Sequence, residues 1–313
     1  MTDPRYGSPV AGVIVEGRAV VKRWGSTLAL AGVDFAIGPG VTGLLGANGA
    51  GKTTLLGLLL GMHSADSGSL SVLGLDPATQ GPLVRARIGY APEHDSLPPD
   101  VSAHDIVRHL AELHGLPRRE ATGRASDVLY ELGLGEERFR HVGTMSTGQR
   151  QRVKLAQAIG HDPELVLLDE PTNGLDPVQR DEMLRLIHRV GHTLGIHVIL
   201  SSHLLEEVER VSDAVVILDQ GRAVAGGQLA DLRTEHGELL VQVDGDAAAV
   251  VDRLRAKGIA AEATAGRIVV PFADEQVYDD VRDAIASARA SLRRLERRTS
   301  SLEDVFLAAG DSA

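Results

Sequence analysis

The segment Gly46–Thr53 reads GANGAGKT and is the most informative part of the chain. It fits the pattern G-x-x-x-x-G-K-[ST], in which the backbone N–H groups of a glycine-rich loop surround phosphate oxygens. The apolar run Val41–Leu45 precedes it, and leucines at helical spacing follow between residues 53 and 61. A loop in this position presents the positive end of the following helix to the same anion. We therefore expect a phosphate-binding loop here.

Individual positions of this loop have expected tasks. The Lys52 ammonium would reach the β- and γ-phosphates of a nucleotide, and the Thr53 hydroxyl would ligate Mg²⁺. A glycine-rich loop with an incidental lysine is the alternative, which the flanking strand and helix disfavour. The residues expected to contact the nucleotide at this loop are Gly46, Asn48, Gly49, Ala50, Gly51, Lys52, Thr53 and Thr54.

A second candidate group follows the apolar run Leu165–Leu168, which ends in Asp169 and Glu170. A carboxylate at the tip of a buried strand suits the metal shell of a phosphate-loop site, so Asp169 is an expected Mg²⁺ ligand. Glu170 can polarise an attacking water as a general base. A solvated acidic turn is the alternative. We favour the catalytic interpretation because the chain also carries the phosphate loop.

The order of elements predicts two domains. Strand-like and helix-like segments alternate over the first part of the chain, which is typical of an α/β sheet. Only helical patterns occur between about residues 95 and 160, so we expect a helical subdomain inserted in the α/β domain. After residue 235 the order becomes β-α-β-β-α-β, the split βαβ pattern. The predicted domains are residues 1–235 and a small α+β domain, residues 236–313.

Composition excludes several classes of protein. The 313 residues carry 43 acidic and 32 basic side chains, a formal net charge of −11, which argues against a nucleic-acid partner held by a basic surface. The chain has no cysteine, so disulfides and thiol catalysis are excluded. We find no leader-like segment and no apolar run of about 20 residues. We therefore expect a cytoplasmic protein that acts at a membrane only through a partner.

Residues 145–149 read MSTGQ and resemble the signature sequence of the ATP-binding cassette (ABC) ATPases, which is usually LSGGQ. Ser146, Gly148 and Gln149 match, and Gln149 lies 20 residues before Asp169. Taken alone, such a segment at the start of a helix is a further anion-binding terminus or an ordinary N-cap. The resemblance covers about residues 12–232. It implies a P-loop NTPase core of ABC type that binds ATP and Mg²⁺ and hydrolyses ATP at Glu170.

Three other residues resemble family positions. Asp176, in NGLD, resembles the D-loop aspartate, and His203, just past a buried strand, resembles the switch histidine that contacts the γ-phosphate. Trp24 is the only tryptophan and lies where the family places an aromatic residue that stacks on adenine. The alternatives are a structural role for His203 and a place in the core for Trp24.

The chain departs from the family at Glu93, in the segment IGYAPE. The family usually carries glutamine there as a ligand of Mg²⁺ and water. Glutamate can still bind Mg²⁺ through oxygen, so we expect Glu93 to contact the nucleotide site as a metal ligand. It also adds a negative charge near ATP and accepts hydrogen bonds without donating any when ionised.

The resemblance implies a function and partners. The ending Ser301–Leu307 is similar to that of ATPase subunits of bacterial drug and antibiotic exporters. We therefore expect the nucleotide-binding subunit of an ABC exporter, peripheral to the inner face of the membrane and working with a separate transmembrane permease. The second ATPase subunit would be another copy of this chain or a homologue. A soluble regulator of translation or repair, and the motor of an importer, are the alternatives.

Overall fold

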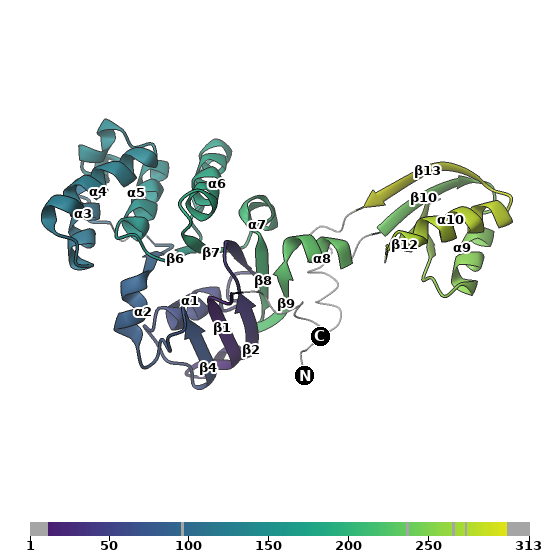
Figure 1. The fold of residues 1–313 in the computed structure, drawn as a ribbon, viewed down its shortest axis with the longest axis horizontal. Helices are drawn as coiled ribbons and strands as arrows, with labels where there is room; N and C mark the ends of the chain where they lie inside the picture. The colour runs from purple at the N-terminus through teal and green to yellow at the C-terminus, as the bar shows by residue number, and fades with distance from the viewer. Residues whose placement is uncertain (1–11, 95–96, 236–237, 265–266, 273, 299–313) are drawn as a thin grey trace. The chain divides into compact units, whose positions relative to one another are not determined.

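The computed structural model describes residues 12–94, 97–235, 238–264, 267–272 and 274–298 (Figure 1). The chain divides into two compact units, residues 1–227 and 228–313. The first unit contains two β-sheets, and the second has a separate four-stranded sheet. None of the three clusters of buried apolar side chains among the described residues crosses from one unit to the other.

A six-stranded sheet forms the centre of the first unit. Strands β5, β6, β7, β3 and β8 are neighbours in this order and pair in parallel. This pairing is expected for short apolar runs that are buried on both faces. Parallel strands end at one edge, so the loops after β3, β5, β6 and β7 lie near one another there. The strand order is β5 (Ile88–Ala91), β6 (Leu165–Asp169), β7 (His197–Ser202), β3 (Val41–Leu45), β8 (Ala214–Asp219) and β9 (Arg222–Gln228).

Both faces of this sheet are covered, as the alternation along β6 shows. Leu165 and Leu167 belong to one buried cluster, and Val166 and Leu168 belong to another, because successive side chains of a strand point to opposite faces. The cluster with Leu165 includes side chains of helix α1 (Lys52–Leu59) and of a three-stranded antiparallel sheet, formed by β2 (Thr27–Ile37), β1 (Val15–Trp24) and β4 (Ser67–Val72). The cluster with Val166 includes side chains of α5 (Thr147–Ile159) and α6 (Pro177–His192), among other helices.

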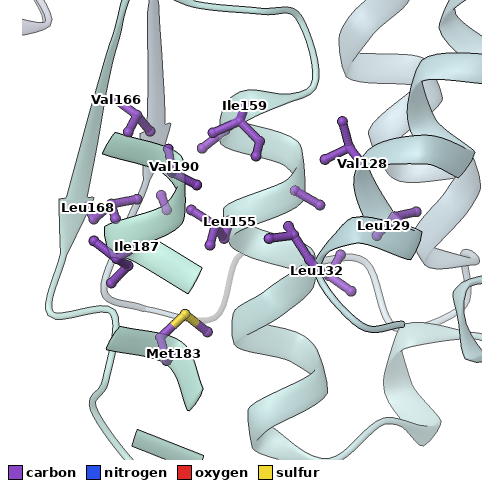
Figure 2. Close-up of a cluster of buried hydrophobic side chains, with 14 of the residues drawn as sticks. Val128, Leu129, Leu132, Leu155, Ile159, Val166, Leu168, Met183, Ile187 and Val190 are labelled. Atoms are coloured by element: carbon purple, nitrogen blue, oxygen red, sulfur yellow. The ribbon is translucent and has the colours of Figure 1, made fainter. Parts of the chain in front are cut away.

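The predicted helical insertion is confirmed. It consists of α3 (Ala103–Leu113), α4 (Arg118–Glu131) and α5. In Figure 2, Leu155 of α5 lies between Leu132, at the end of α4, and Ile187 of α6, all within one buried cluster. Helix α5 therefore packs both against α4 within the insertion and against α6, which covers one face of the sheet.

Sequence patterns did not reveal every element of this unit. Strand β4 reads SGSLSV, in which only the last four residues alternate between polar and apolar, a signal too short to identify a strand. The antiparallel arrangement of β1, β2 and β4 was not expected either, since it depends on pairing between distant segments. The remaining helices are short: α2 (Gly81–Arg87), the 3₁₀ turns η1 (Glu136–Phe139) and η2 (Val142–Thr144), and α7 (Leu205–Val211).

The second unit has the expected β-α-β-β-α-β order. Its strands pair antiparallel in the order β11-β12-β10-β13. Leu239 and Val241 of one strand pack with Val250 and Val281 of the two longer helices, so these helices cover one face of the sheet. The elements are α8 (Leu229–Glu235), β10 (Glu238–Asp244), α9 (Ala247–Ala256), β11 (Glu262–Thr264), β12 (Arg267–Pro271), α10 (Gln276–Ser287) and β13 (Ser291–Arg298).

Two further sequence-based expectations concern the end of the chain and membrane-spanning segments. The exporter-like ending at residues 301–307 lies outside the described residues. Within the described part of the chain, no helix combines the length and the apolar character needed to cross a bilayer.

Candidate active site

The phosphate loop needs glycine at two positions where the backbone is crowded. A Cβ atom at Gly46 would lie 2.4 Å from the Leu218 carbonyl oxygen. Gly51 has a φ of +108°, and a Cβ atom there would lie 2.7 Å from the Ala29 carbonyl oxygen. Helix α1 begins directly afterwards at Lys52. The loop therefore turns tightly into a helix N-terminus, as anion binding requires.

A cavity of about 530 Å³ lies against this loop. Its size is in the range of sites for nucleotide-sized ligands. The lining combines the loop with side chains from other segments: Trp24, Thr27, Leu28, Ala29, Ala47, Asn48, Gly49, Gly51, Lys52, Thr53, Thr54, Glu93 and Glu170. The fold thus brings together most of the loop residues, the tryptophan and two of the candidate carboxylates, whereas Gly46 and Ala50 of the loop do not line the cavity.

The ammonium of Lys52 is buried within the loop. Its Nζ atom donates hydrogen bonds to the carbonyl oxygens of Gly46, at 2.6 Å, and Ala47, at 3.4 Å. It also forms an ion pair with Glu170 Oε1 at 3.2 Å. The positive charge is therefore fixed at the centre of the loop, where the phosphates of a nucleotide would lie.

Asp169, another candidate carboxylate, is hydrogen-bonded to Thr53. The Thr53 hydroxyl donates to Asp169 Oδ2 at 3.1 Å, and the hydroxyl of the fully buried Ser201 donates to Oδ1 at 2.6 Å. Burial raises the pKa of Asp169, and the negative charges of Glu93 and Glu170 add to the effect, whereas the two hydrogen bonds lower it. The site therefore concentrates negative charge, a property that favours a divalent cation.

Glu170 is held from both ends. Its carboxylate lies 2.8 Å from His203 Nδ1, and its backbone N–H donates to Ser201 Oγ at 2.9 Å. Glu170 has a φ of +47°, in the left-handed region that non-glycine residues rarely adopt. Such strained residues concentrate at functional sites, where the surrounding structure holds them.

Glu93 reaches the cavity from the loop after β5. Its Oε1 atom accepts a hydrogen bond from Asn173 Nδ2 at 3.1 Å, and its carbonyl oxygen accepts one from Lys154 Nζ at 2.9 Å. Burial, with the charges of Asp169 and Glu93, raises the pKa of Tyr90 to about 12. The negative charge of Glu93 therefore helps to raise the pKa of Tyr90 on β5 and of Asp169 on β6.

Trp24 lines the cavity and is 45% exposed, which contradicts the alternative that it is a core residue. Its Nε1 atom donates to Thr54 Oγ1 at 3.4 Å. The ring contacts the His63 ring edge-on, and the Lys22 ammonium lies 4.9 Å from the ring centroid. An aromatic face at the rim of a phosphate site is suited to stacking on a base.

The signature segment does not line this cavity. Ser146 and Gln149 form a capping box at the start of α5, and a Cβ atom at Gly148 would lie 2.5 Å from the Gln179 side chain of α6. Asp176 caps α6 by accepting from the Gln179 N–H. Within one chain, the signature residues and Asp176 therefore lie next to each other and outside the phosphate cavity.

Three residues with direct roles in this geometry were missed by the sequence analysis: Ser201, Asn173 and Lys154. A serine at the end of an apolar strand gives a weak signal, since a buried hydroxyl needs partners. The lysine and the asparagine carry no signal of their own. Their partners come from distant segments that only the fold brings together.

The parallel sheet and the glycine-rich loop before α1 define a P-loop nucleoside triphosphatase. The profile of the ABC transporter family matches residues 30–173. Known relatives match over most of the chain at more than 30% identity. The chain therefore belongs to the ABC transporter family, as an ATPase subunit.

The relatives include named resistance and export proteins. Linearmycin resistance ATP-binding protein LnrL of Bacillus subtilis is 34% identical over 74% of this chain and 74% of its own length. Nod factor export ATP-binding protein I of Burkholderia orbicola is 33% identical over 94% of this chain and 95% of its own. Among solved structures, cbiO1 from Clostridium perfringens, titled as part of the ABC transporter complex cbiONQ, has a TM-score of 0.65 and 27% identity, covering 71% of this chain and 90% of its own.

Proposed function

We propose that this chain hydrolyses ATP to drive export through a separate membrane permease. The observation that carries the proposal is the cavity at the phosphate loop, in which Lys52, Glu93, Glu170 and Trp24 meet. The names of the relatives support export rather than import, since one is a resistance protein and another an export protein. The second of these matches this chain along nearly its whole length, both units included.

The residues of the cavity can perform hydrolysis. Lys52 and the N–H groups of the loop bind the phosphates. Glu170 accepts a proton from the water whose oxygen attacks the γ-phosphorus. The bond between the γ-phosphorus and the bridging oxygen then breaks, and ADP and phosphate leave. His203, 2.8 Å from the same carboxylate, holds Glu170 in place and faces the γ-phosphate in this proposal.

Thr53 and Asp169 fit a magnesium ion. Both offer oxygen ligands, which lie 3.1 Å apart, and Mg²⁺ is usually bound by one or two carboxylates together with substrate phosphates. The pKa of Asp169 is raised chiefly by burial and also by the charges of Glu93 and Glu170, and a bound cation would stabilise the ionised carboxylate. Bound Mg²⁺ would stabilise the charge that develops on the phosphates. Glu93 is the proposed third ligand.

A second ATPase subunit completes the proposed site. The chain has one phosphate loop and one signature segment, and the signature residues do not line the cavity. We propose that two copies, or this chain and a homologue, close head to tail around two ATP molecules. Ser146, Gly148 and Gln149 of one subunit would then face the phosphates bound by the other, with Asp176 beside them.

In this proposal, the membrane-spanning part of the transporter is a different protein. The solved relative cbiO1 is described as part of an ABC transporter complex. We place the chain at the cytoplasmic face of the membrane, bound to its permease. Because the transport pathway lies in that permease, the transported compound is a property of the partner.

Co-purification tests this proposal. The chain should be retained by a membrane protein with about six transmembrane helices encoded beside its gene, and the transported compound should stimulate ATP hydrolysis by the complex. ATP-dependent loss of that compound from cells supports export, whereas accumulation indicates an importer. Full ATPase activity with no membrane protein bound would indicate a soluble regulator.

A further inference from the structure

Three hydrogen bonds join α5, the loop after β5 and the loop after β6, beside the cavity. Lys154 Nζ donates to the Glu93 carbonyl oxygen at 2.9 Å, and Asn173 Nδ2 donates to Glu93 Oε1 at 3.1 Å. Gln151 Nε2 donates to the Asn173 carbonyl oxygen at 3.3 Å. Gln151 and Lys154 are three residues apart in α5, so they lie on one side of that helix.

Burial makes the lysine in this group unusual. The side chain of Lys154 is only 3% exposed, and the residues on either side of it in the chain, Val153 and Leu155, are buried and apolar. Lysine is almost never fully buried unless its charge is paired or hydrogen-bonded. A leucine or methionine would fill the same space without this requirement. The bond to the Glu93 carbonyl oxygen is therefore one reason why a lysine can be buried at this position.

Glu93 is consequently anchored twice, and both anchors lie outside the cavity. Lys154 holds its main chain and Asn173 holds its carboxylate, whereas neither residue is among those that line the cavity. Lys154 belongs to the helix that starts at Ser146, and Asn173 lies three residues before Asp176. The position of the Glu93 charge therefore depends on α5 and on the loop before Asp176. In the proposed function, these two segments face the ATP that is bound by the second subunit.

We propose that Lys154 and Asn173 are positioning residues that fix the Glu93 carboxylate at the Mg²⁺-nucleotide site. This inference rests on the proposed function, because it assumes that ATP and Mg²⁺ bind in the cavity. Lys154 fixes the main chain of Glu93 and Asn173 fixes the direction of its carboxylate, so both bonds are needed to place the charge.

A double-mutant cycle tests the inference. The variants are Asn173→Ala, Glu93→Ala and the pair. Asn173 is exposed, so its truncation is compatible with folding. The Mg²⁺ concentration for half-maximal ATPase activity is measured for each full-length chain. A second readout is the Mg²⁺ dependence of binding a non-hydrolysable ATP analogue, measured by calorimetry. We expect Asn173→Ala to raise both Mg²⁺ requirements by about threefold or more in the native background, and by less than about twofold beside Glu93→Ala.

Lys154→Met provides the second arm, because methionine keeps the length and removes the charge. We expect the same increase in the Mg²⁺ requirement, again reduced beside Glu93→Ala. The control is Gln157→Ala, a substitution in the same helix that should leave the Mg²⁺ requirement unchanged. If Lys154→Met fails to fold, the cycle with Asn173→Ala still decides whether the Glu93 carboxylate is held by a positioning residue.

Two results would overturn the inference. One is an equal shift by Asn173→Ala with and without Glu93, which would show that Asn173 acts independently of that carboxylate. The other is an unchanged Mg²⁺ requirement in Glu93→Ala. Failure of the premise that ATP and Mg²⁺ bind in the cavity is recognised separately, since the unsubstituted chain would then neither bind the analogue nor hydrolyse ATP.

Discussion

The imidazole of His203 lies 2.8 Å from Glu170 Oε2, and the Lys52 ammonium lies 3.2 Å from the other oxygen of the same carboxylate. These three residues follow three different strands of the parallel sheet, β7, β6 and β3, which are adjacent in the order β6-β7-β3. The sheet therefore brings the proposed base to the phosphate loop. A carboxylate held between two nitrogen groups is oriented before substrate binds, which is what a general base requires.

The first prediction tests Glu170 as the base. Glu170→Gln keeps the size of the side chain and its contact with His203, but an amide does not accept the proton of the attacking water. We expect ATP turnover to fall by about 10²-fold or more, while ATP binding is retained and an ATP-bound dimer accumulates in size-exclusion chromatography. Glu120→Gln, in an exposed part of α4, is the control. Near-normal turnover would remove Glu170 from this role.

The second prediction concerns Trp24, whose exposed ring lines the cavity. Adding ATP without Mg²⁺ should change the tryptophan fluorescence, and no other tryptophan contributes to the signal. Trp24→Ala should weaken ATP binding by about 1–3 kcal/mol if it stacks as aromatic residues do on nucleic-acid bases. Trp24→Phe keeps an aromatic face and should restore most of the affinity. An unresponsive signal together with unchanged affinity in Trp24→Ala would exclude stacking.

Local patterns predicted the fold well where one segment contains the whole signal. The phosphate loop, the buried run that ends in Asp169 and the strand before His203 are read from adjacent residues, and the parallel sheet follows from their alternation with helices. Pairing between distant segments is a different matter. The antiparallel partner of β4, for example, is β1, and the six residues of β4, SGSLSV, do not indicate which strand that partner is.

The same limit applies to the candidate site. Motifs identified the residues that contact substrate in the proposal, but not the residues that hold them. Ser201 is an example, because its task is visible only once β6 and β7 lie side by side with Asp169 opposite it in register. The bond between Lys154 and Glu93 likewise joins positions 61 residues apart. Such contacts depend on tertiary structure and leave no local pattern.

The third prediction follows from the two bonds of Ser201. Its hydroxyl donates to Asp169 and accepts from the Glu170 N–H, and the side chain is fully buried. Ser201→Ala leaves a buried N–H without its partner, which costs about 1–3 kcal/mol of stability, and removes one of the two hydrogen bonds that hold the Asp169 carboxylate. We expect turnover to fall more steeply than ATP affinity. Turnover equal to that of the native chain, with only the melting temperature lowered, would make Ser201 purely structural.

The last prediction concerns pH and a pair of stacked histidines in the helical insertion. The rings of His114, at the end of α3, and His161, just after α5, lie 3.6 Å apart between centroids. The pKa of His161 is lowered from 6.5 to about 4, chiefly by burial and also by the neighbouring His114 and Arg124, while a hydrogen bond to the Ile88 backbone and the charge of Asp162 oppose the shift. The folded protein therefore keeps His161 neutral at pH values where the unfolded chain protonates it.

The stability that neutral His161 contributes is fully present above pH 6.5 and is lost as the pH falls toward 4, by about 1.4 kcal/mol per pH unit where only the unfolded chain binds the proton. His161→Phe keeps a flat ring against His114 and removes the titrating group. Its free energy of unfolding, from urea titrations at pH 7, 6 and 5, should fall less than that of the native chain. His109→Gln, an exposed histidine of α3, should follow the native chain. Parallel curves for all three proteins would mean that His161 is not the source of acid sensitivity.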